Sequence, residues 1–279
     1  MLVKKAYFKS SKRCPAKQCL HLVEFVYQVT LNRPRKVNAL NKTMWLEIKK
    51  SFDELARAKD CRVIVLSGAG EIIYSRRHAT GSCSRCPRRR GSQSKDNVQP
   101  YCDVSEQHVA TLEESRKTVL AAVHSACIGA GVAMITAADM RYCTKDAWFQ
   151  VKETLEWRQT LVLYKRLPKV IGSDSLAREL CYTARRMQAE EALSSGLVSS
   201  FREQRKDVGR SFKIAEEIAQ KSPVAVQGTK RSLVYSRDHS LKEGLHQITL
   251  WNQLMLQSEE FVQATMGQLT KDNVKFSKL

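Results

Sequence analysis

The chain has 279 residues, 43% of them hydrophobic, which is enough for one large domain or two small ones with a substantial core. Its formal charge of +19 is concentrated in residues 1–20 and 76–95, two segments with many lysines and arginines and no acid. The sequence shows neither an aromatic-rich sheet pattern nor a zinc-finger spacing. We therefore expect solvated, irregular segments there rather than a nucleic-acid interface.

Cysteine usage and hydropathy argue against a disulfide scaffold, a metal site and a membrane span. The nine cysteines are an odd number without a preceding secretory signal, so we expect a reducing compartment. Cys83 and Cys86 form a CxxC pair followed by Cys102, but no fourth ligand stands at a standard zinc spacing. Residues 118–138 are uncharged and long enough to span a bilayer, yet they are mostly small residues.

Both ends of the chain resemble sorting signals. The residues Ser277, Lys278 and Leu279 form the tripeptide that the peroxisomal import receptor reads, so this receptor is an expected partner. Residues 1–19 are basic, contain serine and lack acids, as transit peptides do. We expect the peroxisome as the first location and the mitochondrion as the second.

The first part of the chain alternates between strand and helix patterns. Residues 20–31 alternate in polarity and predict one strand, and Asn41 predicts the N-cap of an amphipathic helix. Short apolar runs predict strands at 62–66, 119–123, 140–143 and 148–151. Small residues at 125–131 predict a turn, and 132–138 a tightly packed helix. This order is typical of an α/β domain.

From Leu161 onward the pattern becomes helical. Ser173 and Ser222 predict N-caps, the second with proline at the first helical position. Residues 240–256 carry a stripe of apolar residues at helical spacing. The sequence thus predicts an α/β body with an all-helical C-terminal third. Residues 76–106 lack hydrophobic periodicity and predict an irregular insert.

The stretch from 118 to 153 is the candidate functional region. A strand, a glycine turn and a helix in succession direct backbone N–H groups at an anion. Gly129 and Gly131 fit this reading, and they fit equally well a turn that only allows close packing of helix and strand. His124 is expected to be a packed core histidine rather than a catalyst.

Six segments resemble the crotonase (enoyl-CoA hydratase/isomerase) superfamily, and within it the Δ3,5-Δ2,4-dienoyl-CoA isomerases. They are LNRPRKVNALNKTMW, DCRVIVLSGAG, AAVHSACIGAGVAMITAADMRYCTKDAWFQVKE, RLPKVIG, ALSSGLV and SPVAVQGTKRSLVYSRDHS. The resemblance implies a crotonase-like α/β fold, with a ββα spiral over residues 20–200. It also implies a helical trimerisation region at 201–276 and trimers that pair as hexamers.

The same resemblance implies an acyl-CoA thioester as substrate, with CoA as part of the substrate and no further cofactor. Two backbone N–H groups would hold the thioester oxygen and stabilise an enolate. One falls at Ala130, between Gly129 and Gly131. The other falls near Arg77, a residue that either contacts the substrate or lies in a solvated loop. Glu153 matches the first of two proton-transfer carboxylates.

The chain departs from the family pattern at two acidic positions, which carry Ala133 and Thr160. We therefore expect a dienoyl-CoA isomerase-like protein of fatty-acid β-oxidation whose activity is reduced or lost. The alternative is a non-catalytic acyl-CoA-binding or oligomer-partner homologue. Without the surrounding motif, Glu153 by itself would be interpreted as a solvated or salt-bridged residue.

The insert at 76–106 has the composition of an out-of-frame translation. We predict that the coding DNA, read in another frame across this interval, encodes a glycine–aspartate loop and an amphipathic helix. Sequencing the gene checks this. If neither alternative frame encodes these features, the insert is a diverged segment.

Overall fold

The computed structural model describes residues 19–70, 108–152, 161–202, 209–270 and 276. These residues form two sheets, with strand orders β1-β2-β3-β4-β6-β9 and β5-β7-β8. In the first sheet, the neighbouring strands β2, β3, β4, β6 and β9 pair in parallel, and β1 is antiparallel to β2. In the second sheet, β5 and β7 are parallel, and β7 and β8 are antiparallel. The strands are β1 (Cys19–Val23), β2 (Val26–Leu31), β3 (Val63–Gly68), β4 (Thr118–Val123), β5 (Ala126–Ile128), β6 (Met140–Thr144), β7 (Trp148–Gln150), β8 (Arg186–Gln188) and β9 (Ser200–Arg202).

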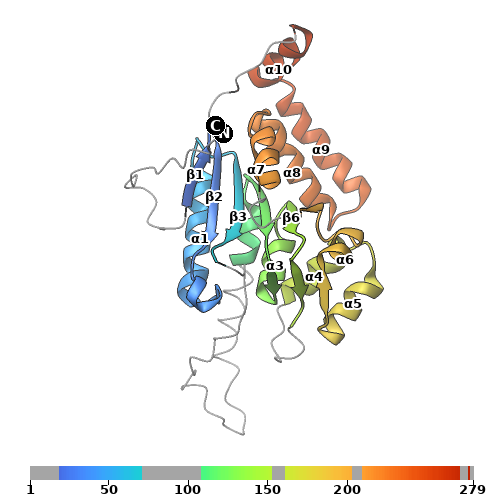
Figure 1. The fold of residues 1–279 in the computed structure, drawn as a ribbon. Coiled ribbons are helices and arrows are strands. Elements are labelled where there is room, and N and C mark those ends of the chain that lie inside the picture. The colour runs from blue at the N-terminus through green and yellow to red at the C-terminus, as the bar shows by residue number, and fades with distance from the viewer. Residues whose placement is uncertain (1–18, 71–107, 153–160, 203–208, 271–275, 277–279) are drawn as a thin grey trace, which may run out of the picture.

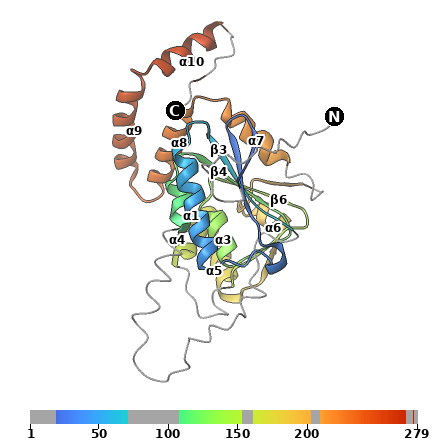
Figure 2. The same ribbon diagram turned by 90° about the vertical axis from the view of Figure 1, so that its left-hand side faces the viewer.

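Helices cover both faces of the main sheet, and Figure 2 shows α1 and α7 on opposite sides of β3 and β4. Helix α7 packs on one face, over a small apolar cluster that includes Val65 and Ala215. Helices α1 and α3 belong to the other face, where the larger cluster includes Phe52 and Ile135. The helices are α1 (Lys42–Arg57), α3 (Ala130–Thr136), α4 (Leu161–Val170), α5 (Asp174–Thr183), α6 (Ala189–Ser194), α7 (Gly209–Ala219), α8 (Pro223–Ser236), α9 (Leu241–Met255) and α10 (Glu259–Thr270), with a further helix whose described part is 108–114.

The two C-terminal helices lie at the periphery. Helix α9 runs along α8, and α10 extends away from the body (Figure 1). A Cβ atom at Gly228 of α8 would lie 2.4 Å from Nε1 of Trp251, so glycine permits the two helices to approach closely. None of the side chains of α9 is buried. Among the described residues, every helix is too short or too polar to cross a membrane.

The predicted helix starts are confirmed by their capping geometry. In each case a side-chain oxygen accepts a hydrogen bond from a backbone N–H three residues further along the chain. The capping residues are Asn41 at 2.9 Å, Ser173 at 3.2 Å and Ser222 at 3.3 Å. The local chemistry of these residues therefore sets where the helices begin.

Two predictions about strands are wrong. Residues 20–31 form two antiparallel strands rather than one, because Phe25 adopts a φ of 66° and reverses the chain between β1 and β2. The C-terminal third is not all-helical, because β8 and β9 lie within it. Strand β9 pairs with β6 and so extends the main sheet. Three-residue strands are too short to show a polarity alternation in the sequence.

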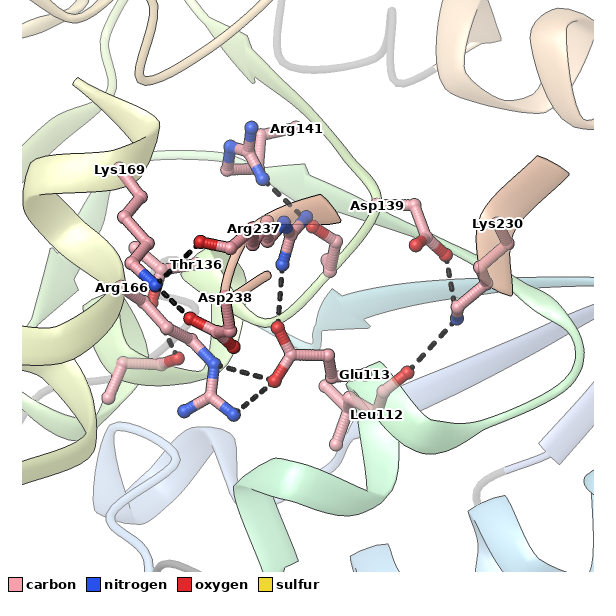
Figure 3. Close-up of polar contacts among 12 residues, drawn as sticks. Leu112, Glu113, Thr136, Asp139, Arg141, Arg166, Lys169, Lys230, Arg237 and Asp238 are labelled. Atoms are coloured by element: carbon pink, nitrogen blue, oxygen red, sulfur yellow. Dashed lines mark hydrogen bonds and ion pairs between the residues drawn. The ribbon is translucent and has the colours of Figure 1, made fainter. Parts of the chain in front are cut away.

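A buried ion pair connects α8 to the sheet (Figure 3). Nζ of Lys230 lies 2.8 Å from Oδ2 of Asp139 and donates to the backbone carbonyls of Leu112 and Lys117 at 3.3 and 2.9 Å. The same Asp139 oxygen accepts from Val119 N of β4 at 2.7 Å. Burial lowers the pKa of Lys230, while the Asp139 carboxylate opposes that shift. The ammonium thus connects α8 to two segments that are distant in sequence, residues 112–117 and Asp139.

We predict that Lys230→Met lowers the free energy of unfolding by about 3 kcal/mol, because Asp139 and two carbonyls lose a buried partner. Lys169→Met is the matched control, since Lys169 pairs with Asp238 at the surface and its loss should cost less than about 1 kcal/mol. Urea denaturation of both variants measures the difference. Equal losses would contradict the assigned role of the buried pair.

Candidate functional site

The glycine turn lies between β5 and α3. Gly129 has φ 54° and ψ −118°, a backbone conformation that residues with a Cβ atom rarely adopt. Its carbonyl accepts the hydrogen bond from Ala133 N at 3.1 Å. The N–H groups of Ala130, Gly131 and Val132, which precede Ala133, have no intrahelical acceptor because they belong to the first turn of α3. Ala130 is half-buried and the other two are buried.

Strand β7 holds this turn in place. Ile128 is paired with Gln150 in the parallel register of β5 and β7, and Gly129 N donates to the Gln150 carbonyl at 2.8 Å. The described chain continues from Gln150 to Lys152, which directly precedes Glu153 in the sequence. The turn and the segment leading to Glu153 are therefore neighbours through backbone hydrogen bonds.

A second loop closes over the carboxyl ends of β2 and β3. Asn38 is fully buried, and its amide nitrogen donates to the Ala69 carbonyl at 2.9 Å. Its amide oxygen accepts from Arg33 N at 2.7 Å. Gly70 has φ 82°, and a Cβ atom there would lie 2.7 Å from Cβ of Pro34. The loop before α1 and the loop after β3 are thereby fixed against each other.

His124 links this second loop to β4. Its Nε2 lies 2.9 Å from the Gly70 carbonyl oxygen, and the side chain is half-buried. The expectation of a packed core histidine is therefore wrong. Because His124 follows β4 and Gly70 follows β3, this contact lies at the carboxyl edge of the parallel strands, where ligands bind in open α/β sheets.

The structure brings together only some of the predicted site residues. Gly129 lies in the turn, and Ala130 and Gly131 begin α3, whereas Glu153 and Arg77 lie outside the described residues. The predicted turn at 125–131 is wrong at 126–128, which form β5 and pair with β7. Ala133 is fully buried in the main core, so the position where the family pattern has an acid faces apolar neighbours here. Thr160 is also outside the described residues.

Sequence reasoning missed the buried Asn38 and the link between His124 and Gly70. The signal for Asn38 was its place in a segment between a strand and a helix, four residues after Pro34. Its role depends on a carbonyl 31 residues away, which the local sequence does not reveal.

Thiol chemistry is disfavoured at this site. Cys127 lies in β5, the strand that precedes the glycine turn, and burial raises the pKa of its thiol. Burial also raises the pKa of Cys143 to about 12. Both groups therefore stay protonated near neutral pH, and a protonated thiol is a poor nucleophile. The described residues contain no group of three or more His, Cys, Asp or Glu placed to hold a metal ion.

The remaining chemistry is that of backbone N–H groups aimed outward from the start of a helix. Such groups stabilise an oxyanion because their dipoles are already oriented before charge develops. The carboxyl edge of the sheet also offers the His124 ring and fixed loops. This arrangement suits a substrate whose carbonyl oxygen gains negative charge.

Comparison with known proteins agrees with this geometry. The family model described as enoyl-CoA hydratase/isomerase matches residues 23–276. The Delta(3,5)-Delta(2,4)-dienoyl-CoA isomerase, mitochondrial, of Homo sapiens is 43% identical over 91% of this chain and 80% of its own length. The protein of that name described as peroxisomal, from Arabidopsis thaliana, is 37% identical over 91% of this chain and 93% of its own.

Solved structures show the same fold. The enoyl-CoA hydratase from Bacillus anthracis superposes with a TM-score of 0.82 over 94% of this chain and 99% of its own, at 22% identity. An enoyl-CoA hydratase/isomerase from Marinobacter aquaeolei also gives 0.82, over 93% and 99%, at 22% identity. The expected crotonase-like α/β fold is therefore confirmed. The chain belongs to the enoyl-CoA hydratase/isomerase (crotonase) family.

Proposed function

We propose that this protein binds an acyl-CoA thioester and shifts the double bonds of a 3,5-dienoyl-CoA by proton transfer, as part of fatty-acid β-oxidation. The observation that carries the proposal is the Gly129–Gly131 turn, whose backbone N–H groups have no intrahelical acceptor and lie beside the strand that leads to Glu153. The names of the relatives from Homo sapiens and Arabidopsis thaliana support the dienoyl-CoA substrate. CoA is part of the substrate, and the proposal includes no cofactor.

In this mechanism the thioester oxygen accepts a hydrogen bond from Ala130 N. Glu153 removes a proton from the carbon chain, and the electron pair moves onto the thioester oxygen to form an enolate. The enolate collapses when the protonated Glu153 returns the proton further along the chain. Because Thr160 stands near the position of the second proton-transfer carboxylate, one carboxylate must serve both steps, and we expect slower turnover than with two carboxylates.

The alternative is a protein that binds acyl-CoA without catalysis or assembles with an active homologue. Ala133 favours it, because that side chain lies fully inside the apolar core. Both proposals keep the oxyanion contact at Ala130. They differ only in whether proton transfer follows binding.

Turnover of a 3,5-dienoyl-CoA, followed by the absorbance of the conjugated product, separates the two. We predict measurable turnover that Glu153→Gln lowers by about 10²- to 10⁴-fold, since it removes the proton-transfer group. Glu156 is the next acid after Glu153 in the sequence and matches no carboxylate of the family pattern, so Glu156→Gln is the matched control and should keep the parental rate. Binding of the acyl-CoA without any turnover in the parent protein would favour the non-catalytic alternative.

We also propose that the protein forms a homotrimer or a hexamer through its C-terminal helices. Helices α9 and α10 expose many large apolar side chains, and exposed apolar side chains in such number are typical of an interaction site. Those with more than half of their surface exposed are Leu241, Leu245, Leu250, Leu254, Leu256, Val262, Met266 and Leu269.

Sedimentation analysis tests this assembly. We predict that the parent protein sediments as a trimer or hexamer and that Leu254→Glu shifts it to a smaller species, because a charge would be buried in the interface. Tyr182→Glu on α5, an equally exposed site at 68%, is the control and should leave the assembly intact. A parent protein that is monomeric at micromolar concentration would contradict the proposal.

The peroxisomal address rests on Ser277, Lys278 and Leu279 and stays a prediction. The names of the relatives include both the mitochondrion and the peroxisome.

A further inference from the structure

A groove lies at the end of the sheet opposite to the candidate site. It has a volume of about 950 Å³ and is bordered by the C-terminal half of α1 with Lys59, the helical residues 108–114, residues 115–117 and one residue of α8. Lys59 and Lys117 precede β3 and β4, whereas Gly70 and His124 follow them. A strand of six residues is roughly 20 Å long, so the groove and the candidate site are separate.

Basic side chains dominate this groove. The cationic lining residues are Lys49, Arg57, Lys59, Arg116 and Lys117, and the acidic ones are Asp53 and Glu114. Asp53 is already paired with Lys49, with 2.6 Å between Oδ2 and Nζ. Five cations against two carboxylates leave an excess of three positive charges. None of these residues belongs to the two basic segments at 1–20 and 76–95 that carry most of the net charge of the chain.

Lys117 is the most buried cation of the groove. Lys117 is 5% exposed, and within the described part of the chain no carboxylate or carbonyl forms a hydrogen bond or ion pair with its ammonium group. Burial lowers the pKa of Lys117, and the nearby Arg116 and Arg62 lower it further, against the opposing effects of Cys61 and Asp60. A buried cation without a partner is costly, and a bound anion would remove that cost.

We propose that this groove binds a small molecule that carries a diphosphate group. A diphosphate supplies two to three negative charges, which match the excess in the lining. The guanidinium groups of Arg57 and Arg116 are exposed, and such groups bind phosphate oxygens in a bidentate manner. The volume lies in the range of small-molecule pockets and exceeds the needs of a single phosphate. Ala56 and Ala110 provide an apolar wall for the remainder of the ligand.

Titration calorimetry of the full chain with inorganic pyrophosphate and with ADP tests the proposal. We expect both probes to bind, and we expect the double variant Arg57→Ala/Lys59→Ala to bind about tenfold more weakly or worse, because charge-assisted hydrogen bonds are lost. The control is Arg210→Ala/Lys213→Ala on α7, which removes the same charges from exposed positions outside the groove. The control should bind pyrophosphate within about twofold of the parent when both proteins are measured at the same salt concentration.

A single-residue variant tests the groove by adding a negative charge instead of removing positive ones. Gln227→Glu places a negative charge in the lining and should weaken pyrophosphate binding, while circular dichroism confirms an unchanged fold. ADP could also bind where an acyl-CoA binds, so the titrations are repeated with saturating acetyl-CoA. Pyrophosphate binding that persists there and depends on Arg57 and Lys59 supports the groove. Absence of binding, or equal loss in the groove and control variants, overturns the proposal, whatever the outcome of the dienoyl-CoA assay.

Discussion

The carboxylate of Asp139 is the constraint on which the rest of the structure depends. It joins the start of β4 to the ammonium of Lys230, while Asp139 N donates to the Val119 carbonyl at 2.9 Å. The chain between Val119 and Asp139 contains β4, β5, the glycine turn and α3. The two hydrogen bonds between Val119 and Asp139 hold the ends of this segment together and so position the turn relative to the main sheet. The ion pair of Asp139 with Lys230 attaches α8 and the helices that follow it.

The candidate site then results from backbone geometry rather than from reactive side chains. Gly129 turns the chain with a conformation that suits glycine, and Gln150 holds the turn by its carbonyl. On the other side, Asn38 and His124 fix the loops at the carboxyl ends of β2, β3 and β4. Family membership supports the proposed acyl-CoA chemistry for this frame, and Thr160, near the position of the second proton-transfer carboxylate, is the reason why we propose only one working carboxylate.

In the C-terminal helices, the apolar pattern of the sequence predicts the helix correctly but does not identify what covers its apolar face. The apolar stripe at 240–256 predicts a helix, and α9 is that helix, with a capping box at Ser240. The same stripe would ordinarily indicate a face packed on the core of its own chain. In the structure most of it is exposed, although Trp251 lies against Gly228 of the neighbouring helix. An apolar stripe identifies a buried face but not the chain that buries it.

Local signals in the sequence determined the helix starts at Asn41, Ser173 and Ser222, the buried strands and the glycine turn, because capping, periodicity and backbone freedom act within a few residues. The family motifs further determined the fold. Only the tertiary structure decided the reversal at Phe25, the short strands β8 and β9, the role of Asn38 and the buried contacts of Lys230. Each of these depends on partners that lie far apart in the sequence, and a burial or hydrogen-bond requirement of that kind leaves no local pattern.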